Sequence, residues 1–132
     1  CIEEAMRLYP PAYYIDRVTI EEDQWGEHTI PKDTMIRLAI YELHRDPTFW
    51  ESPDKFIPER FDQENVKGLK KHYYPFGAGP RMCVGNNFAM YEMVYTVASI
   101  LQHFKLSTKA QIHINPLITL KPKEANIYFE PR

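Results

Sequence analysis

Cysteine and glycine are scarce in this 132-residue chain, which has two cysteines and five glycines. Two cysteines, Cys1 and Cys83, exclude the disulfide framework of a small secreted scaffold, so we expect a reducing compartment or a thiol used in chemistry. The histidines occur singly and no C-x-x-C pair stands beside them, which excludes zinc-ligand spacing of the common kind.

The chain also lacks a large charge excess and a long apolar run. Its 16 basic and 18 acidic residues give a net charge of -2, so no broad attraction to nucleic acid or to an anionic membrane is expected. The longest apolar stretch, residues 88–101, is interrupted by polar side chains and is too short to cross a membrane comfortably. Hydrophobic residues at 44% and charged residues at 26% are typical of one ordinary globular domain.

An initiator methionine is missing too, because the sequence opens on "CIEEAMRLYPP" with a helix already under way. We therefore expect a piece of a longer protein. Proline and β-branched residues then divide the chain into five parts. These are the end of a helix at 1–12, a small β-region at 13–40, a loop-rich segment at 41–85, a long helix at 86–104 and a terminal hairpin at 112–131.

The long helix is apolar nearly all round, apart from one narrow polar stripe formed by Glu92, Thr96, Ser99 and His103. Such a helix predicts burial on most sides. Asn86 or Asn87 is expected to cap its start. The terminal hairpin is predicted from two short strand-like stretches, "PLITLKP" and "NIYFEP".

The stretch "FGAGPRMCVG", residues 76–85, holds three of the five glycines and Cys83. Glycine is used where the backbone adopts positive φ or comes very close to another surface. A phosphate is one candidate for that surface, but Met82 stands where a dinucleotide motif needs its third glycine. The other interpretation is a tight turn that holds a buried, inert cysteine.

The combination around Cys83 favours a third interpretation. A helix starting just after Cys83 directs its positive dipole end toward the sulfur, which favours a negatively charged thiolate. Arg81 and Phe76 add a cation and an aromatic ring nearby. A thiolate in this setting suits the iron of haem, a flat and anionic macrocycle.

These residues match the F-x-x-G-x-R-x-C-x-G signature of the cytochrome P450 family, the haem-thiolate monooxygenases. "EAMR" at 4–7 resembles the family's E-x-x-R element, and "PERF" at 58–61 resembles the segment that supplies a second arginine. The resemblance covers essentially the whole chain. It implies an α+β segment, the C-terminal part of a mainly helical fold, with short strands, a loop-rich proximal segment and one long buried helix.

The resemblance also implies roles for individual residues. Cys83 would be the catalytic iron ligand, and Arg17 and Arg81 would bind the haem propionates. The ring would be contacted by Phe76, Gly77, Val84, Gly85 and Ala89. A structural triad would consist of Glu4, Arg7 and Arg60, whereas His44 is expected to be a surface or structural residue.

Substrate contacts are implied by position in the family. The segments that reach over the distal haem face would contribute Ala12, Tyr13, Tyr14, Ile15, Leu117 and Ile118. Ordinary core packing is an equally good interpretation of each. If they line a pocket, it is mainly apolar and suits a lipid, a terpenoid or a drug-like molecule better than a charged one.

The implied reaction inserts one oxygen atom from O2 into an apolar substrate at haem b. Electrons come from NAD(P)H through a redox partner, which is a ferredoxin, a flavodoxin or a flavoprotein reductase. Lys67, Lys70 and Lys71 form a basic cluster that could receive this partner, although a solvated loop is the usual meaning of such a run. We expect a cytoplasmic, bacterial enzyme, with a membrane anchor in an N-terminal part still compatible.

Other functions remain open. The chain could be a haem-binding or haem-sensing module without oxygen chemistry, or a structural piece that binds no haem. A peroxide-using or isomerase member of the family would carry the same cysteine loop. We expect residues 1–132 alone to be inactive, because the family's proton-delivering residues lie on a helix that would precede Cys1.

Overall fold

The computed structural model describes residues 1–109 and 113–132. Its first helix, α1 (Ile2–Leu8), ends where Pro10 and Pro11 stop helical geometry. One face of α1 is buried and forms half of a small core, together with Pro10 and with residues between 40 and 50. The fully or almost fully buried side chains are Glu4, Met6, Arg7, Leu8, Pro10, Ile40, His44 and Trp50.

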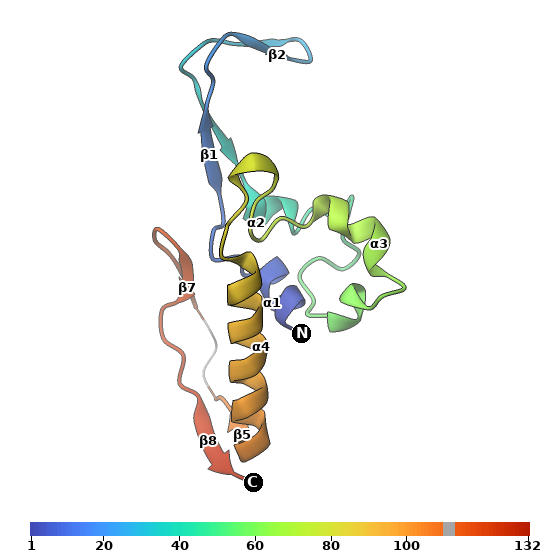
Figure 1. Cartoon of the computed structure of the whole chain (residues 1–132), viewed down its shortest axis with the longest axis vertical. Coiled ribbons are helices and arrows are strands. Elements are labelled where there is room, and N and C mark those ends of the chain that lie inside the picture. The colour runs from blue at the N-terminus through green and yellow to red at the C-terminus, as the bar shows by residue number, and fades with distance from the viewer. Residues whose placement is uncertain (110–112) are drawn as a thin grey trace.

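A two-stranded arm follows α1. Strand β1 (Ile15–Val18) pairs antiparallel with β4 (Met35–Leu38), and β2 (Asp23–Trp25) pairs with β3 (His28–Ile30) at the far end. Gly26, with φ of 60°, allows the tight turn between β2 and β3. The arm extends away from the rest of the molecule, as the blue and cyan strands at the top of Figure 1 show.

The segment after the arm contains only short helices, because prolines interrupt it repeatedly. They are α2 (Ile40–Leu43), η1 (Pro58–Phe61), α3 (Val66–Leu69), η2 (Lys70–His72) and η3 (Gly79–Arg81). Helix η1 contacts α1, which brings the second half of this segment back to the start of the chain.

Helix α4 (Asn86–His103) is the long helix of the structure. Gly85, not Asn86 or Asn87, is its N-cap, because both asparagines already lie within the helix. No side chain caps this end. The carbonyl of Gly85 accepts the first hydrogen bond, from Ala89 N–H at 2.9 Å.

The predicted burial of this helix is not seen in residues 1–132. None of its residues is buried, and Phe88 and Tyr91 are 72% and 76% exposed. The apolar pattern is present, but the described chain packs only β5 (Phe104–Ser107) closely against α4.

The predicted terminal hairpin is wrong in its pairing. Strand β7 (Leu120–Pro122) pairs with β6 (Ile114–Pro116), and β8 (Tyr128–Pro131) pairs with β5. The turn falls inside "PLIT", a stretch expected to be strand, and β7 therefore pairs with β6 before it. The last strand, β8, pairs instead with β5 at the end of α4. Residue 112, the expected start of the hairpin, lies outside the described residues.

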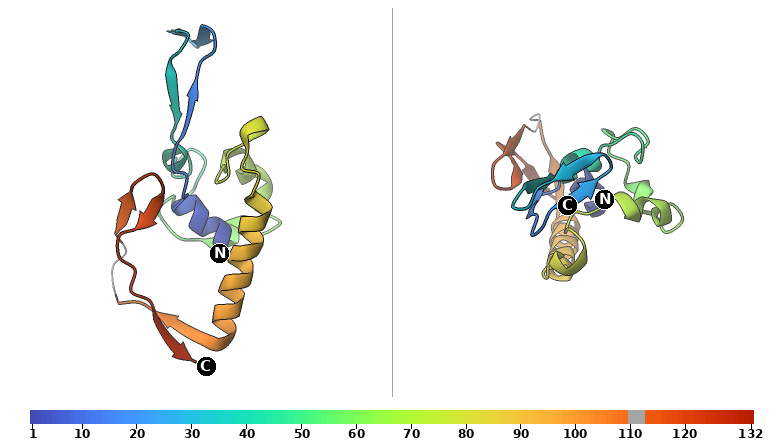
Figure 2. Two further views of the ribbon diagram at one scale, coloured as in Figure 1. Left: turned by 60° about the vertical axis from the view of Figure 1, so that its left-hand side comes forward. Right: turned by 90° about the horizontal axis from the view of Figure 1, so that it is seen from above.

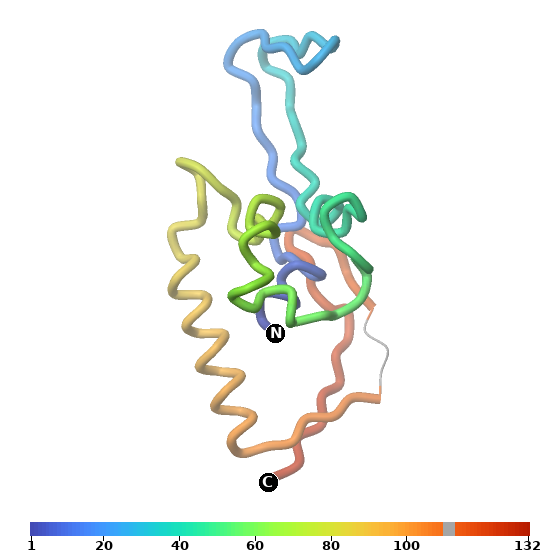
Figure 3. The backbone as a smooth tube through the Cα atoms, turned by 90° about the vertical axis from the view of Figure 1, so that its right-hand side faces the viewer, coloured from blue at the N-terminus to red at the C-terminus, as the bar shows by residue number. Residues whose placement is uncertain are grey.

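The C-terminal strands and α4 run along different sides of the molecule and meet at the end of α4 (Figures 2 and 3). A hydrogen bond of 2.9 Å from Leu120 N–H to the Pro11 carbonyl ties β7 to the segment after α1. No helix within the described residues is both long and apolar enough to cross a membrane.

Candidate functional site

The loop that carries Cys83 is closed by its own backbone hydrogen bonds. Cys83 N–H donates to the Phe76 carbonyl at 2.9 Å, and Met82 N–H donates to the Gly79 carbonyl at 3.0 Å. Gly77 and Gly79 have φ of 72° and 68°, a conformation that other residues rarely adopt. A Cβ at Gly77 would lie 3.4 Å from Ile15 Cδ1, so the loop touches β1 here, and the positive φ is the reason for glycine.

A hollow of about 340 Å³ opens between this loop and the start of the arm. The Cys83 thiol is free and exposed there. The residues that line the hollow come from three separate parts of the chain. They are Pro11, Ala12, Ile15, Arg17, Pro75, Phe76, Gly77, Arg81 and Cys83.

Two arginines give this region its charge. Arg17 and Arg81 line the hollow and also an adjoining one of about 360 Å³, shared with Asp16 and Val18. Arg17 donates to the backbone carbonyl of Asp16 at 2.8 Å, and Arg81 makes no hydrogen bond or ion pair with the described residues. A sulfur that can bind iron, apolar walls for the ring and two cations for its carboxylates suit an anionic iron macrocycle. The residues present therefore fit haem.

Three of the expected ring contacts lie outside this lining. Val84 is fully exposed, and Gly85 and Ala89 belong to the start of α4. Gly85 has an ordinary φ of -91°, so its backbone conformation does not require glycine. A Cβ at Gly85 would lie 4.0 Å from Cys83 Sγ, which places the sulfur beside the N-terminus of α4.

The expected substrate contacts separate into two groups. Ala12 and Ile15 line the hollow with Cys83, whereas Tyr13 and Tyr14 line another hollow of about 520 Å³ with β6 and β7. Tyr13 donates its hydroxyl hydrogen to the Leu117 carbonyl at 2.7 Å, so the two expected segments do meet. Ile118 is 91% exposed and lies beyond this contact.

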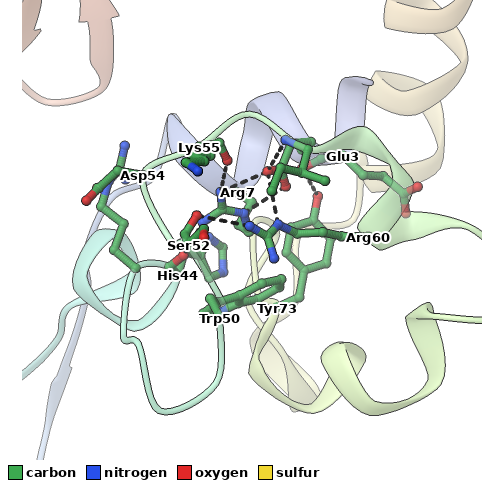
Figure 4. Close-up of polar contacts among 12 residues, drawn as sticks. Glu3, Arg7, His44, Trp50, Ser52, Asp54, Lys55, Arg60 and Tyr73 are labelled. Atoms are coloured by element: carbon green, nitrogen blue, oxygen red, sulfur yellow. Dashed lines mark hydrogen bonds and ion pairs between the residues drawn. The ribbon is translucent and has the colours of Figure 1, made fainter.

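Glu4 and Arg7 form a buried ion pair on α1. Figure 4 shows Arg7 at the centre of its polar contacts, with Lys55 and Arg60 labelled beside it. Arg7 donates to both carboxylate oxygens, from Nε at 2.7 Å and from Nη2 at 2.8 Å. Nη1 also donates to the His44 carbonyl at 2.7 Å, and Nη2 donates to the Lys55 carbonyl at 3.1 Å. Both side chains have no exposed surface, unlike the solvated pair that i, i+3 spacing usually gives.

Arg60 of η1 joins the pair, with its Nε 3.4 Å from Glu4 Oε1. It also donates to the Ser52 carbonyl at 3.0 Å, and Ile57 N–H donates to Glu4 at 2.9 Å. Burial alone would raise the pKa of Glu4. The hydrogen bonds from Arg7 and Ile57, and the positive charges of Arg7 and Arg60, nevertheless hold that pKa below its usual value.

His44 is the residue whose importance the sequence did not reveal. Its side chain is completely buried, and its Nε2 accepts a hydrogen bond from Tyr74 N–H at 2.9 Å. Burial, with the nearby charges of Arg7 and Arg45, lowers the pKa of His44 to about 4. Only the local pattern "ELHRDP" surrounds it in the sequence, and nothing in that pattern marks a buried histidine.

The basic cluster lies on the short helices before the cysteine loop. Lys67 is in α3, and Lys70 and Lys71 are in η2. All three side chains are exposed and make no ion pair with the described residues.

Comparison with known proteins decides the family. The cytochrome P450 family model matches residues 1–129. The chain belongs to the cytochrome P450 family. Among curated P450s, rat cytochrome P450 3A18 is 38% identical over 92% of this chain and 24% of its own length. Hamster lithocholate 6-beta-hydroxylase is 41% identical over 83% of the chain and 22% of its own length. Drosophila melanogaster cytochrome P450 4d2 is 45% identical over 80% of the chain and 21% of its own length.

The fold agrees with this assignment. The solved haem domain of cytochrome P450DA superposes with a TM-score of 0.92 and 30% identity, over 99% of this chain and 30% of that domain. The predicted fold class, a part of the P450 fold, is therefore confirmed. The chain spans about a quarter of the length of the curated P450s that it matches.

Proposed function

We propose that this chain supplies the proximal, iron-ligating side of a haem-thiolate monooxygenase. The observation that carries the proposal is the exposed Cys83 thiol in a hollow that it shares with Arg17 and Arg81. When bound, haem with a thiolate ligand supplies the O2 activation by which one oxygen atom enters an apolar substrate.

The chain's own residues hold the ligand in place. The hydrogen bond from Cys83 N–H to Phe76, and the turn at Gly77 and Gly79, fix the path of the loop. The sulfur lies beside the N-terminus of α4, where a helix dipole stabilises negative charge, so Cys83 serves as a thiolate ligand.

Some of the remaining haem contacts follow from the same hollow. Arg17 and Arg81 would bind the propionates through charge-assisted hydrogen bonds, and Phe76 and Gly77 would contact the ring. Val84, Gly85 and Ala89 lie outside the lining, and their contact with the ring is proposed from the family resemblance. The Glu4, Arg7 and Arg60 network is too deeply buried to touch substrate, so it acts in folding and haem retention.

The substrate is an apolar small molecule. Ala12 and Ile15 give the hollow near Cys83 an apolar wall. Tyr13 and Tyr14, which line the separate hollow of about 520 Å³, and the exposed Ile118 are proposed as further substrate contacts. One relative is named as hydroxylating lithocholate, a substrate that is mostly an apolar steroid skeleton, so lithocholate is the first probe we choose.

Electrons come from NAD(P)H through a ferredoxin, a flavodoxin or a flavoprotein reductase. The exposed cluster of Lys67, Lys70 and Lys71 attracts the acidic face of such a partner. Turnover requires protein beyond these residues, and residues 1–132 alone are inactive. A cytoplasmic location and a bacterial source stay predictions, and the relatives named above are animal proteins.

The test uses the intact protein, loaded with haem and supplied with NADPH, a P450 reductase, lithocholate and 18O2. We expect a hydroxylated product that carries one 18O atom, and none from Cys83→Ser. Haem retained without product under these conditions, and with laurate as a second probe, would favour a haem-binding module. Product formed from peroxide but not from O2 and NADPH would identify a peroxide-using member.

A further inference from the structure

Tyr74 lies just before the cysteine loop, and a distant residue holds its backbone. Tyr74 N–H donates to His44 Nε2 at 2.9 Å, although the two residues are 30 positions apart. The Tyr74 carbonyl in turn accepts from Gly77 N–H at 3.1 Å. Gly77 lines the hollow with Cys83, so the loop starts from a point that an imidazole fixes.

The backbone of His44 faces the buried ion network. Its carbonyl accepts from Arg7 Nη1 at 2.7 Å, and Arg7 is bound twice to Glu4. His44 therefore contacts the network through its carbonyl and the loop through its ring. The ring stacks on Tyr73 with centroids 5.3 Å apart and meets Trp50 edge-on at 6.3 Å, which fixes its orientation.

The protonation state of the ring decides which hydrogen bonds His44 can make here. Nε2 accepts from an N–H, so it carries no proton and the ring hydrogen is on Nδ1. Nδ1 is buried, and the backbones of Arg7 and Met6 interact with the ring and favour its protonated form, against the larger effect of burial. At its other nitrogen the imidazole supplies an acceptor for Tyr74.

We propose that His44 is a positioning residue for the cysteine loop, holding Tyr74 N–H with its Nε2 lone pair while its carbonyl holds Arg7. The role rests on the proposed function, because the loop matters for activity only if Cys83 binds iron. Protonation of Nε2 would turn the acceptor into a donor that faces another donor, and the loop would lose its anchor.

The charged groups that face His44 determine the pH at which its Nε2 is protonated. Arg7 of α1 and Arg45 next to His44 are positive, Tyr73 after η2 is neutral, and Glu4 is bound to Arg7. Burial and the two arginine charges lower the pKa of His44 to about 4, so the anchor is intact at neutral pH.

The test compares His44→Leu and His44→Gln with wild type, in the intact, haem-loaded protein. Leucine removes the acceptor, whereas the glutamine oxygen can accept from Tyr74 N–H but cannot be protonated near pH 4. The control is His28→Gln, an exposed histidine of β3 on the arm. Two quantities are measured: hydrogen exchange of the Tyr74 amide, and the thiolate-type Soret band of the reduced carbon monoxide complex between pH 7.5 and 4.

We expect Tyr74 exchange to accelerate about 5–10-fold in His44→Leu, as loss of one hydrogen bond implies, and to stay near wild type in His44→Gln and His28→Gln. The band of wild type should weaken as pH falls toward 4, where about half of His44 is protonated, and His44→Gln should keep more of its band at pH 4.

Unchanged Tyr74 exchange in His44→Leu, or the same acid midpoint in His44→Gln and wild type, would overturn the role. If His44→Leu does not fold, the acid midpoint of His44→Gln decides. Absence of a thiolate band in wild type would reject the function of Cys83, and Tyr74 exchange would still decide whether His44 anchors the loop.

Discussion

Arg17 and Arg81 line the same two hollows, although Arg17 belongs to strand β1 of the arm and Arg81 to helix η3. Both side chains are exposed. The only hydrogen bond of Arg17 within the described residues goes to a backbone carbonyl, and Arg81 makes no side-chain hydrogen bond there, so neither charge is neutralised by a carboxylate. Both guanidinium groups are therefore available to an anion, and haem propionates meet this requirement.

Replacing either arginine should weaken haem retention. Each loses a charge-assisted hydrogen bond, so we expect Arg17→Leu and Arg81→Leu to release haem about tenfold faster than wild type. The rate is measured by transfer of haem to an excess of a haem-scavenging protein. Lys105→Leu, an exposed change on β5, is the control. Release rates equal to that of the control would show that these arginines do not bind the propionates.

Loss of the buried carboxylate should destabilise the protein far more than loss of an exposed one. Glu4→Gln leaves Arg7 and Arg60 buried without a counter-charge, so we expect a loss of about 3–5 kcal/mol in the free energy of unfolding. Asp16→Asn breaks the bidentate pair with the half-exposed Arg37, and a much smaller loss is expected because water screens this exposed pair. Denaturant titration of the intact protein compares the two. Equal losses would contradict a special role for the buried network.

Stability should also fall in mildly acidic solution because of His44. Its pKa is about 4 when folded and about 6.5 when unfolded, so between these values the unfolded chain binds more protons. The stabilising contribution is therefore complete above pH 6.5 and is lost as pH falls toward 4. The difference amounts to about 3 kcal/mol. The lowered pKa of Glu4 adds a further loss only below about pH 4.5.

Urea titrations of the intact protein at pH 7.5, 6, 5 and 4 measure this contribution. In His44→Gln the decline between pH 6.5 and 4.5 should be smaller than in wild type, since glutamine does not titrate. A decline of equal size in both proteins would assign it to other groups.

Charge reversal in the basic cluster should slow electron delivery. Lys70→Glu together with Lys71→Glu replaces attraction by repulsion toward an acidic partner, so we expect reduction of haem to slow at least tenfold at low salt. The spectrum of the haem should not change, because both residues are exposed on η2. Lys121→Glu on β7 is the control. Stopped-flow reduction that is unaffected by the double change would exclude docking at this cluster.

Features that the sequence predicted well depend on local chemistry. The cysteine loop needs positive φ at Gly77 and Gly79, and both glycines are visible in the printed sequence. Likewise, Pro10 and Pro11 mark the end of α1. The i, i+3 spacing of Glu4 and Arg7 favours their contact on a helix, whereas only the family resemblance suggested that the distant Arg60 joins them.

Features that depend on distant pairing were missed. The strand partners at the C-terminus depend on a turn at Leu117 and on the return of β8 to β5, and neither is favoured by local propensity alone. His44 is buried because α1, α2 and the segment around Tyr73 converge on it, a consequence of tertiary packing. The apolar faces of α4 predicted burial, yet what covers a helix depends on which other elements surround it.

The most direct measurement of the central claim is the absorption spectrum of the intact protein, loaded with haem, reduced and exposed to carbon monoxide. The comparison includes Cys83→Ser and Cys1→Ser, because both cysteines are free and exposed. Wild type and Cys1→Ser should give a Soret band shifted far to the red, as thiolate ligation does, and Cys83→Ser should lose it. A red-shifted band that survives in Cys83→Ser, or a wild-type band like that of histidine-ligated haem, would contradict ligation of the iron by Cys83.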